Sequence, residues 1–296
     1  MSIRWGVSPI AWANDDMPEL GGDTPLEDIL ADIRNVGFEG VELGGKFPRR
    51  AGELKPLLDG YGLDLIGGWY SGSLLVQDSG AEIAALQDHL SLLKAMGSTV
   101  FVFAETSNAV HGDRAVSLDG APRLGSEGWP PFGRRLTDVA DYIHSQGLKF
   151  AYHHHLGTVV ETGDDLEAFI AATGPSVGLT LDTGHAALGG VNALAVIRDH
   201  PDRVVHVHCK DVRWETFRDA REGGFSFLDG VLAGMFTVPG DGGINYAEVM
   251  QALRRMDYSG WIVIEAEQDP GVADPRKYAD LGLRTLKARA AEAGLV

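Results

Sequence analysis

Residues 151–158 read AYHHHLGT, so three consecutive histidines stand at the end of a run of strand-forming apolar residues. Three further clusters of acids and histidines close similar runs, namely LDTGH at 181–185, VHVHCKD at 205–211 and IEAEQD at 264–269. The carboxyl ends of parallel strands meet on one face of a barrel, where polar side chains from many strands can converge. The recurrence therefore predicts a barrel with a metal site at its mouth.

Outward from this stretch, short apolar runs alternate with longer segments whose apolar residues recur at helical spacing. This alternation predicts parallel strands joined by crossover helices. Eight strands are expected near residues 3–8, 40–44, 63–69, 98–105, 148–155, 177–182, 203–208 and 260–265. Helices are expected to start at Thr24, Ser79, Thr162 and Asn245, each followed three residues later by an acid, and to stop at Gly37, Gly62, Gly97 and Gly147.

The repeats continue without a linker or a break in composition, which predicts one α/β domain over residues 1–296, a single (β/α)8 TIM barrel. The structural alternative is an open doubly wound sheet. Against it, no Gly-x-Gly-x-x-Gly motif follows the first strand, and the polar clusters follow many strands instead of one switch point. Two connections, near 106–129 and 211–243, are too long for simple turns, and we expect them to form walls or lids of a pocket.

Charge and composition disfavour several classes of partner. The chain has 25 basic and 42 acidic residues, a formal net charge of -17, which disfavours binding to nucleic acid or to an anionic membrane surface. The single cysteine, Cys209, permits no intrachain disulfide and favours a cytoplasmic location. The N-terminal residues show neither a signal peptide nor an apolar stretch long enough to span a membrane.

The strand period of two decides which side chains of each cluster share a face. Pairs that point the same way are His153 with His155, His206 with His208, and Glu265 with Glu267. Carboxylates and imidazoles that point into a barrel mouth are costly to bury unpaired, and a divalent cation removes that cost. Mixed nitrogen and oxygen ligands suit Mn, Co, Fe or Zn better than calcium, and they do not choose among these four metals.

The clusters resemble motifs of the xylose-isomerase-like TIM barrels, a superfamily that includes ketose epimerases, dehydroshikimate dehydratases and endonuclease IV. The segments DTGH at 182–185 and HVH at 206–208 are typical of the whole superfamily. Three others narrow the resemblance to the inosose dehydratases: YHHHLGT at 152–158, GMFTVPGDG at 234–242 and EAEQDP at 265–270. The resemblance extends over essentially the whole chain.

This resemblance implies a metal-dependent hydro-lyase that dehydrates 2-keto-myo-inositol in myo-inositol catabolism. It implies Asp182, His208 and Glu265 as metal ligands, and it places the remaining ligand, usually a glutamate, at His153. Because His153 departs from the usual pattern, His155, water and the more remote Glu161 stay open as alternatives. The implied metal is Mn or Co, with Zn, Fe and Mg as alternatives, and the resemblance also implies glutathione, which none of these residues explains.

The other polar residues of the mouth are assigned from their chemistry. The catalytic candidates are the proton carriers His155, His185 and Glu267, together with Lys210, whose charge would lie beside a developing enolate. The residues assigned to binding a small polyol ketone are Trp12, Glu42, Trp69, Glu105, His154 and His206. The alternatives are a salt bridge with Asp211 or a rim acid for Lys210, buried ion pairs for the glutamates and core packing for the tryptophans.

Two other functions stay open. A ketose 3-epimerase or sugar isomerase would share the barrel, the metal and the enediolate, and would differ in its product. A non-catalytic sugar-binding barrel is less favoured, because binding alone needs no metal site crowded with proton carriers. DNA repair is disfavoured by the net charge of -17. The acidic surface and the barrel ends are compatible with a homodimer or a tetramer.

Overall fold

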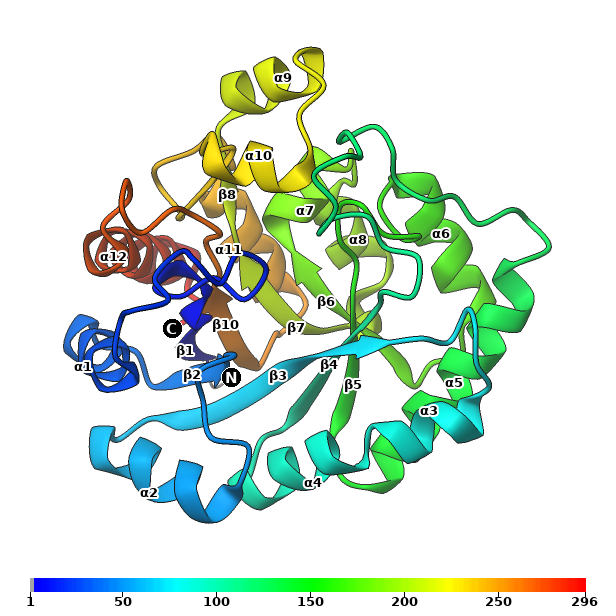
Figure 1. The fold of residues 1–296 in the computed structure, drawn as a ribbon, viewed down its shortest axis with the longest axis horizontal. Helices are drawn as coiled ribbons and strands as arrows, with labels where there is room; N and C mark the ends of the chain where they lie inside the picture. Colours follow the sequence, from blue (N-terminus) through cyan, green and yellow to red (C-terminus); the bar gives the residue numbers. More distant parts are fainter. Residues whose placement is uncertain (1–2) are drawn as a thin grey trace.

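The structure is a computed structural model that describes residues 3–296, and its centre is a closed barrel of parallel strands (Figure 1). The strand order is β1-β10-β7-β6-β5-β4-β3-β2, and β2 pairs back with β1. The barrel strands are β1 (Ile3–Val7), β2 (Gly40–Leu43), β3 (Asp64–Gly72), β4 (Val100–Glu105), β5 (Lys149–His153), β6 (Val177–Asp182), β7 (Val204–Cys209) and β10 (Gly260–Ile264). The predicted TIM barrel is confirmed, with strand ends shifted by no more than three residues.

Helices surround this barrel, as the ring of coils around the central strands in Figure 1 shows. They are α1 (Leu26–Val36), α2 (Ala51–Tyr61), α3 (Ser79–Ala85), α4 (Gln87–Met96), α5 (Trp129–Ser145), α6 (Gly163–Ala172), α7 (Thr183–Leu188), α8 (Ala193–Asp199), α11 (Tyr246–Arg255) and α12 (Pro275–Ala293). Two short 3-10 helices lie at Pro9–Ala11 and Pro201–Arg203. No helix within residues 3–296 combines the length and the apolar character needed to cross a membrane.

Apolar side chains form a packed cluster inside the lower barrel. This inner cluster consists of Ile66, Val100, Val102, Ala151, Trp261 and Val263. Gly6 and Gly40 make room for it, because a Cβ at Gly6 would lie 2.2 Å from Ile66 Cδ1 and one at Gly40 would lie 2.6 Å from Trp261 Cη2. A side chain at either glycine would displace the packed interior.

The helix boundaries follow the expected chemistry only in part. Gly37, Gly62 and Gly97 end their helices in the left-handed conformation, and Gly147 follows α5 with a φ of 92°. Thr162 and Asp165 form the predicted capping box of α6. The other predicted starts are less accurate: Pro25 and Asp78 take the N-cap positions instead of Thr24 and Ser79, and Asn245 occupies its N-cap without a side-chain bond.

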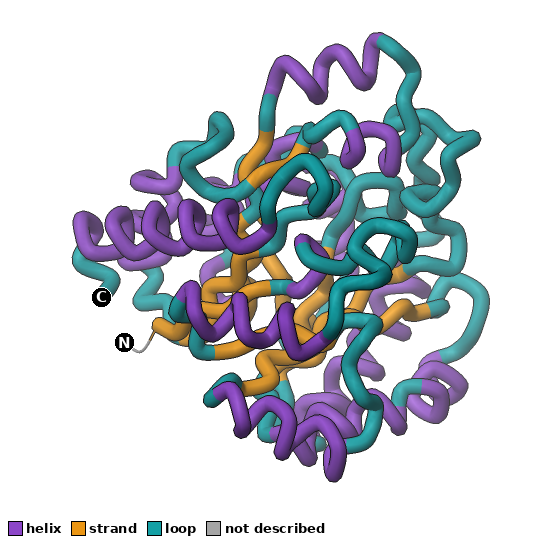
Figure 2. Tube along the Cα trace, turned by 60° about the vertical axis from the view of Figure 1, so that its left-hand side comes forward, coloured by secondary structure: helices purple, strands orange, loops and turns teal. Residues whose placement is uncertain are grey.

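The two long connections differ from each other. Residues 106–128 contain no helix or strand, apart from a bridge between Ser117 and Ser226. The segment 211–243 is not simply a loop, because it holds β8 (Asp211–Val212), α9 (Trp214–Glu222), α10 (Phe227–Leu232) and β9 (Phe236–Thr237). In Figure 1, α9 and α10 stand out from the ring of helices, and Figure 2 shows the loops gathered beside them. The Leu118 amide donates to the Phe225 carbonyl at 2.8 Å, which joins the two segments.

Candidate active site and metal centre

Four side chains from four neighbouring strands meet at the mouth of the barrel. His153 ends β5, Asp182 ends β6, His208 lies near the end of β7 and Glu265 directly follows β10. One ligand atom from each lies within 4.8 Å of the corresponding atoms of the other three. The structure thus brings together the four residues that the sequence assigns to a metal.

Three atoms of this cluster are buried and lack a hydrogen bond within residues 3–296: Nε2 of His153, Oδ2 of Asp182 and Nδ1 of His208. Nε2 of His153 and Oδ2 of Asp182 are 3.9 Å apart. His153 Nδ1 lies 2.8 Å from the His154 carbonyl, so the proton is assigned to Nδ1 and the lone pair of Nε2 faces the cluster. Leaving such atoms unpaired in the interior costs about 1–3 kcal/mol each. Two imidazoles and two carboxylates that converge in this way fit a divalent transition metal.

The short helix α7 orients Asp182. Its Oδ1 accepts hydrogen bonds from the amides of Gly184 and His185, both at 2.8 Å, and thereby caps the helix. Oδ2 is left to face His153, His208 and Lys210, with contacts of 3.8 to 3.9 Å. Burial raises the pKa of Asp182 more than the charge of Lys210 lowers it. The carboxylate therefore gains from a cation at Oδ2.

Glu42, at the end of β2, lies on the opposite side of His208. Its Oε1 is 3.0 Å from Nε2 of His208 and also 3.0 Å from Nε2 of His206. Burial raises the pKa of Glu42, but the charges and hydrogen bonds of the two histidines outweigh it and lower the value to about 2. Glu42 is therefore an ionised acceptor for two imidazole N–H groups.

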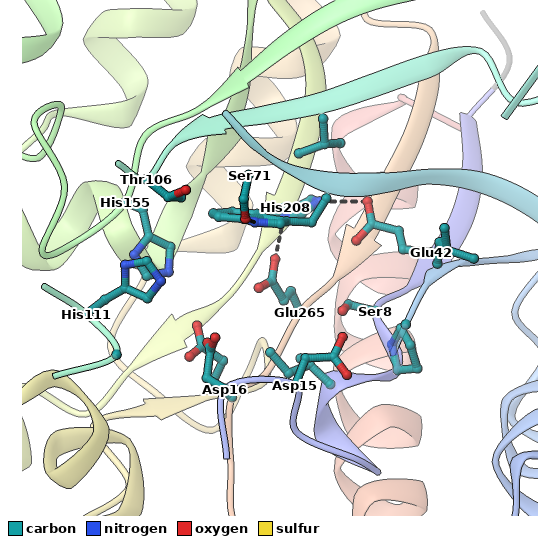
Figure 3. Close-up of a pocket in the computed structure, with 18 of the residues that line it drawn as sticks. Ser8, Asp15, Asp16, Glu42, Ser71, Thr106, His111, His155, His208 and Glu265 are labelled. Carbon is teal, nitrogen blue, oxygen red and sulfur yellow. Dashed lines mark hydrogen bonds and ion pairs between the residues drawn. The ribbon is translucent and has the colours of Figure 1, made fainter. Parts of the chain in front are cut away.

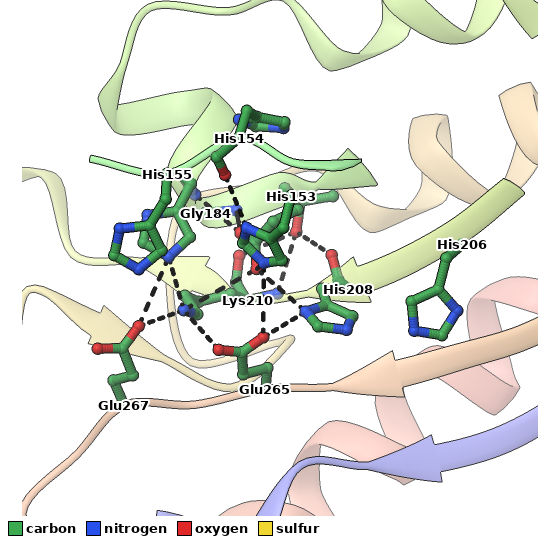
Figure 4. A network of polar contacts seen from close by, with 12 residues as sticks. His153, His154, His155, Gly184, His206, His208, Lys210, Glu265 and Glu267 are labelled. Atoms are coloured by element: carbon green, nitrogen blue, oxygen red, sulfur yellow. Dashed lines mark hydrogen bonds and ion pairs between the residues drawn. The ribbon is translucent and has the colours of Figure 1, made fainter. Parts of the chain in front are cut away.

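A second polar group lies beside the four-residue cluster and consists of His155, His185, Lys210 and Glu267 (Figure 4). Lys210 Nζ joins the two groups, at 3.2 Å from Glu265 Oε1, 2.5 Å from Glu267 Oε1 and 2.9 Å from His185 Nε2. Burial lowers the pKa of Lys210, but the charges of Glu265 and Glu267 outweigh burial and raise the pKa above its ordinary value, so the amine stays charged. Lys210 is fully buried and is not part of the cavity wall, and its contacts here are with these side chains.

The protonation of this second group suits proton transfer. Burial raises the pKa of Glu267 to about 7, although Lys210 opposes the shift. Burial also lowers the pKa of His155 and of His185 well below the usual range, which leaves both imidazoles neutral. His155 Nδ1 lies 2.7 Å from the Leu156 carbonyl, so its proton is assigned there and Nε2 carries the lone pair.

A cavity of about 450 Å³ opens above both groups. Figure 3 shows His208 and Glu265 on its wall between Glu42 and the pair formed by His155 and His111. Glu267 and Trp69 also line it, and the indole of Trp69 meets His153 and His155 edge to face, at 5.3 and 5.8 Å between ring centroids. A cavity of this size accommodates a small polyol in contact with the polar residues of its floor.

Four predicted substrate contacts do not reach this cavity. Trp12 packs in the core and donates to Asp32 Oδ2 at 3.2 Å, and Glu105 accepts the amides of Leu75 and Ser107. His154 points away from the other two histidines because strand residues alternate in direction (Figure 4). His206 lies beneath the mouth and is bonded to Glu42. Their predicted roles in binding are therefore wrong as direct contacts.

Several polar lining residues escaped prediction, and all of them except Ser71 of β3 lie outside the barrel strands. They are Ser8, Asp15, Asp16, Arg49, Ser71, Thr106 and His111. Arg49 is exposed, lines the cavity and donates to the Gly44 carbonyl at 3.1 Å. The connection 106–129 contributes His111 to the wall. The segment 211–243 contributes no lining residue, but Phe227 and Phe236 pack against the ring of His185 from behind.

Comparison with known proteins agrees with this architecture. The sequence profile of the xylose isomerase-like TIM barrel family matches residues 30–289. The rhizopine catabolism protein MocC of Rhizobium meliloti is 47% identical over 99% of this chain and 90% of its own length. The inosose dehydratase of Geobacillus thermodenitrificans is 39% identical over 97% of this chain and 95% of its own.

Solved structures share the fold at much lower sequence identity. D-allulose 3-epimerase from Methylomonas sp. superposes with a TM-score of 0.67 at 17% identity, covering 97% of each chain. This structural likeness shows only that the two chains share a fold. The profile match and the sequence relatives show the family to which the chain belongs. The chain belongs to the xylose isomerase-like TIM barrel family and, within it, to the inosose dehydratases, a family of hydro-lyases.

Proposed function

We propose that this protein is a metal-dependent hydro-lyase that removes water from 2-keto-myo-inositol to give a trihydroxycyclohexane-dione, within myo-inositol catabolism in the cytoplasm. The observation that carries the proposal is the convergence of His153, Asp182, His208 and Glu265 beside a group of buried proton carriers on one cavity. The family relatives support the reaction class. One relative is named for rhizopine catabolism, so the substrate needs its own test.

The metal would be held by the four-residue cluster, since His153 Nε2 and Asp182 Oδ2 are otherwise unpaired. His208 and Glu265 both line the cavity wall, so a ligand in the cavity would lie close to the ion. A divalent cation there would polarise the substrate ketone and make the neighbouring C–H bond more acidic, an effect worth several kcal/mol. We propose Mn or Co as the metal.

The protein side chains would carry the protons. His155 faces the cavity as a neutral imidazole whose Nε2 lone pair is free to accept the proton from carbon. Glu267, on the same cavity, holds a proton near neutral pH and would donate it to the hydroxyl that leaves as water. Lys210 and His185 contact Glu267 from behind and would orient it. Loss of the hydroxyl as water leaves the enol form of the dione, which then tautomerises to the dione.

The test is the product formed from purified protein and 2-keto-myo-inositol in the presence of Mn or Co. Loss of water, followed by mass and by the ultraviolet absorbance of the dione, is the expected result. An isomer of unchanged mass would instead establish an epimerase or isomerase. Glu265→Gln should lower the rate by orders of magnitude, and a near-normal rate would remove Glu265 from the metal site. The same assay with other polyol ketones establishes which substrate is preferred.

A further inference from the structure

Glu42 makes an unusual contact at the edge of the proposed metal site. One oxygen, Oε1, receives two imidazole N–H groups at 3.0 Å, from His206 and from His208. All three side chains are buried, with 7% of Glu42, 1% of His206 and 3% of His208 exposed. Within residues 3–296 no hydrogen bond occupies the other oxygen, Oε2, and Glu42 forms part of the cavity wall.

This contact determines which nitrogen of His208 faces the four-residue cluster. Because an ionised carboxylate can only accept, a proton is assigned to Nε2 of His208, and the ring presents Nδ1 on the opposite side. Nδ1 contacts Glu265 Oε2 and lies 3.8 Å from Asp182 Oδ2, so it is the atom directed at the metal position. With Nδ1 protonated and Nε2 bare, His208 would present a lone pair to the ionised Glu42 and a hydrogen to the cation.

We infer that Glu42 is a positioning residue of the metal centre: its carboxylate fixes the tautomer and the ring orientation of His208, and His206 holds the carboxylate in place. This inference rests on the metal site of the proposed function. Carboxylates that accept the second N–H of a metal-bound histidine orient the ring and strengthen it as a ligand, and their loss typically weakens metal binding by about 10- to 100-fold.

Glu42→Gln tests this role, because glutamine keeps the shape of the side chain and removes its charge. Metal-free wild type and variant would be titrated with Mn or Co in competition with a chromogenic chelator, which yields affinity and stoichiometry without any turnover. We expect about 10- to 100-fold weaker binding for Glu42→Gln and a smaller loss for His206→Gln. Glu82→Gln is the matched control, since Glu82 is also buried but bonds to Tyr70, Ser73 and Gln77, and the metal affinity of this variant should be unchanged.

The outcomes separate this inference from the proposed function. Metal affinity of Glu42→Gln within twofold of wild type would overturn the positioning role alone. Two ions bound per wild-type chain, falling to one in the variant, would also overturn it, because Glu42 would then be a ligand of a second ion. If the wild-type protein binds no metal, both the positioning role of Glu42 and the proposed function are refuted. If Glu42→Gln does not fold, Glu42→Asp replaces it in the test. The shorter side chain keeps the negative charge but moves it away from both imidazole rings, so the account requires the same loss of metal affinity.

Discussion

The two carboxylate oxygens of Asp182 have different roles. Oδ1 caps α7, and Oδ2 points into the four-residue cluster. Asparagine caps a helix as well as aspartate does, but it offers a neutral amide to the metal. We therefore expect Asp182→Asn to keep the melting temperature close to that of wild type while metal affinity falls by at least about tenfold. Calorimetric titration measures the affinity, and Asp78→Asn, which alters the cap of α3, is the control that should bind metal normally.

His155 is the side chain that we expect to take the proton from carbon. Glutamine at this position retains a polar group of similar size but cannot act as a base near neutral pH. Turnover of His155→Gln should therefore fall by about 10²- to 10⁴-fold, with metal affinity unaffected. Steady-state rates of this variant, beside those of His144→Gln on the exposed end of α5, provide the measurement. A turnover number close to that of wild type would exclude His155 as the base.

His89 makes stability depend on pH. Burial lowers the pKa of His89 below its ordinary value of 6.5, more than the bond to the Gly68 carbonyl raises it. The folded state therefore binds a proton less readily than the unfolded state, and this group destabilises the fold as pH falls below 6.5. The free energy of unfolding is measured by urea unfolding at pH values above and below 6.5. It should fall more in wild type than in His89→Gln when the pH is lowered across this value. Equal losses would contradict this sign.

Individual site residues could be predicted from the sequence where the two-residue period of a strand fixes the direction of their side chains. His153, Asp182, His208 and Glu265 follow strands whose alternation fixes their direction, so their convergence was predictable. His154 was assigned to binding against that same alternation, and this assignment is wrong. Asp16 and His111 come from irregular segments, in which no period relates sequence position to direction, and only the fold places them on the cavity.

At the scale of elements, the glycine of α7 keeps the helix close to β7. A Cβ at Gly184 would lie 2.7 Å from Lys210 Cγ and 2.8 Å from its Cβ, both near the base of that side chain. Alanine would favour the helix by roughly 1 kcal/mol but would displace Lys210 from Glu265 and Glu267. Because misplacement by about 1 Å costs about 10²-fold in rate, we expect a loss of that order in Gly184→Ala.

A matched control for this substitution exists in α2. Gly52 also lies within a helix, but a Cβ there meets nothing within 4 Å. Gly52→Ala should thus gain stability in a thermal melt and retain the wild-type turnover. Equal activity of the Gly184 and Gly52 variants would show that the approach of α7 to Lys210 has no role in the reaction.

The strands were more predictable than the connections between them. Buried runs of β-branched residues bounded by glycines mark strands directly, and left-handed glycines mark the ends of α1, α2 and α4. The segment 211–243 was expected to be a loop at the cavity, yet it forms two helices and a small antiparallel sheet. Its aromatic residues pack against the side of His185 away from the cavity, a tertiary arrangement that composition alone does not reveal.

For the molecule as a whole, the closed barrel brings to one face residues that lie far apart in sequence. Glu42 and Glu267 are separated by most of the chain, yet both line one cavity because β2 and β10 flank β1. The apolar interior below that face excludes water from the floor of the cavity, where charged groups interact more strongly. The fold was predictable from eight repeats, whereas the shape of the cavity depends on irregular segments whose paths the strand period does not determine.

The central claim is that this barrel dehydrates a polyol ketone with the help of a divalent metal held by His153, Asp182, His208 and Glu265. The most direct measurement follows formation of the dione from 2-keto-myo-inositol by protein stripped of metal, before and after Mn or Co is restored. The account predicts negligible turnover without metal and recovery with about one equivalent per chain. Full dehydratase activity in the metal-free protein, or a product that retains all the atoms of the substrate, would contradict it.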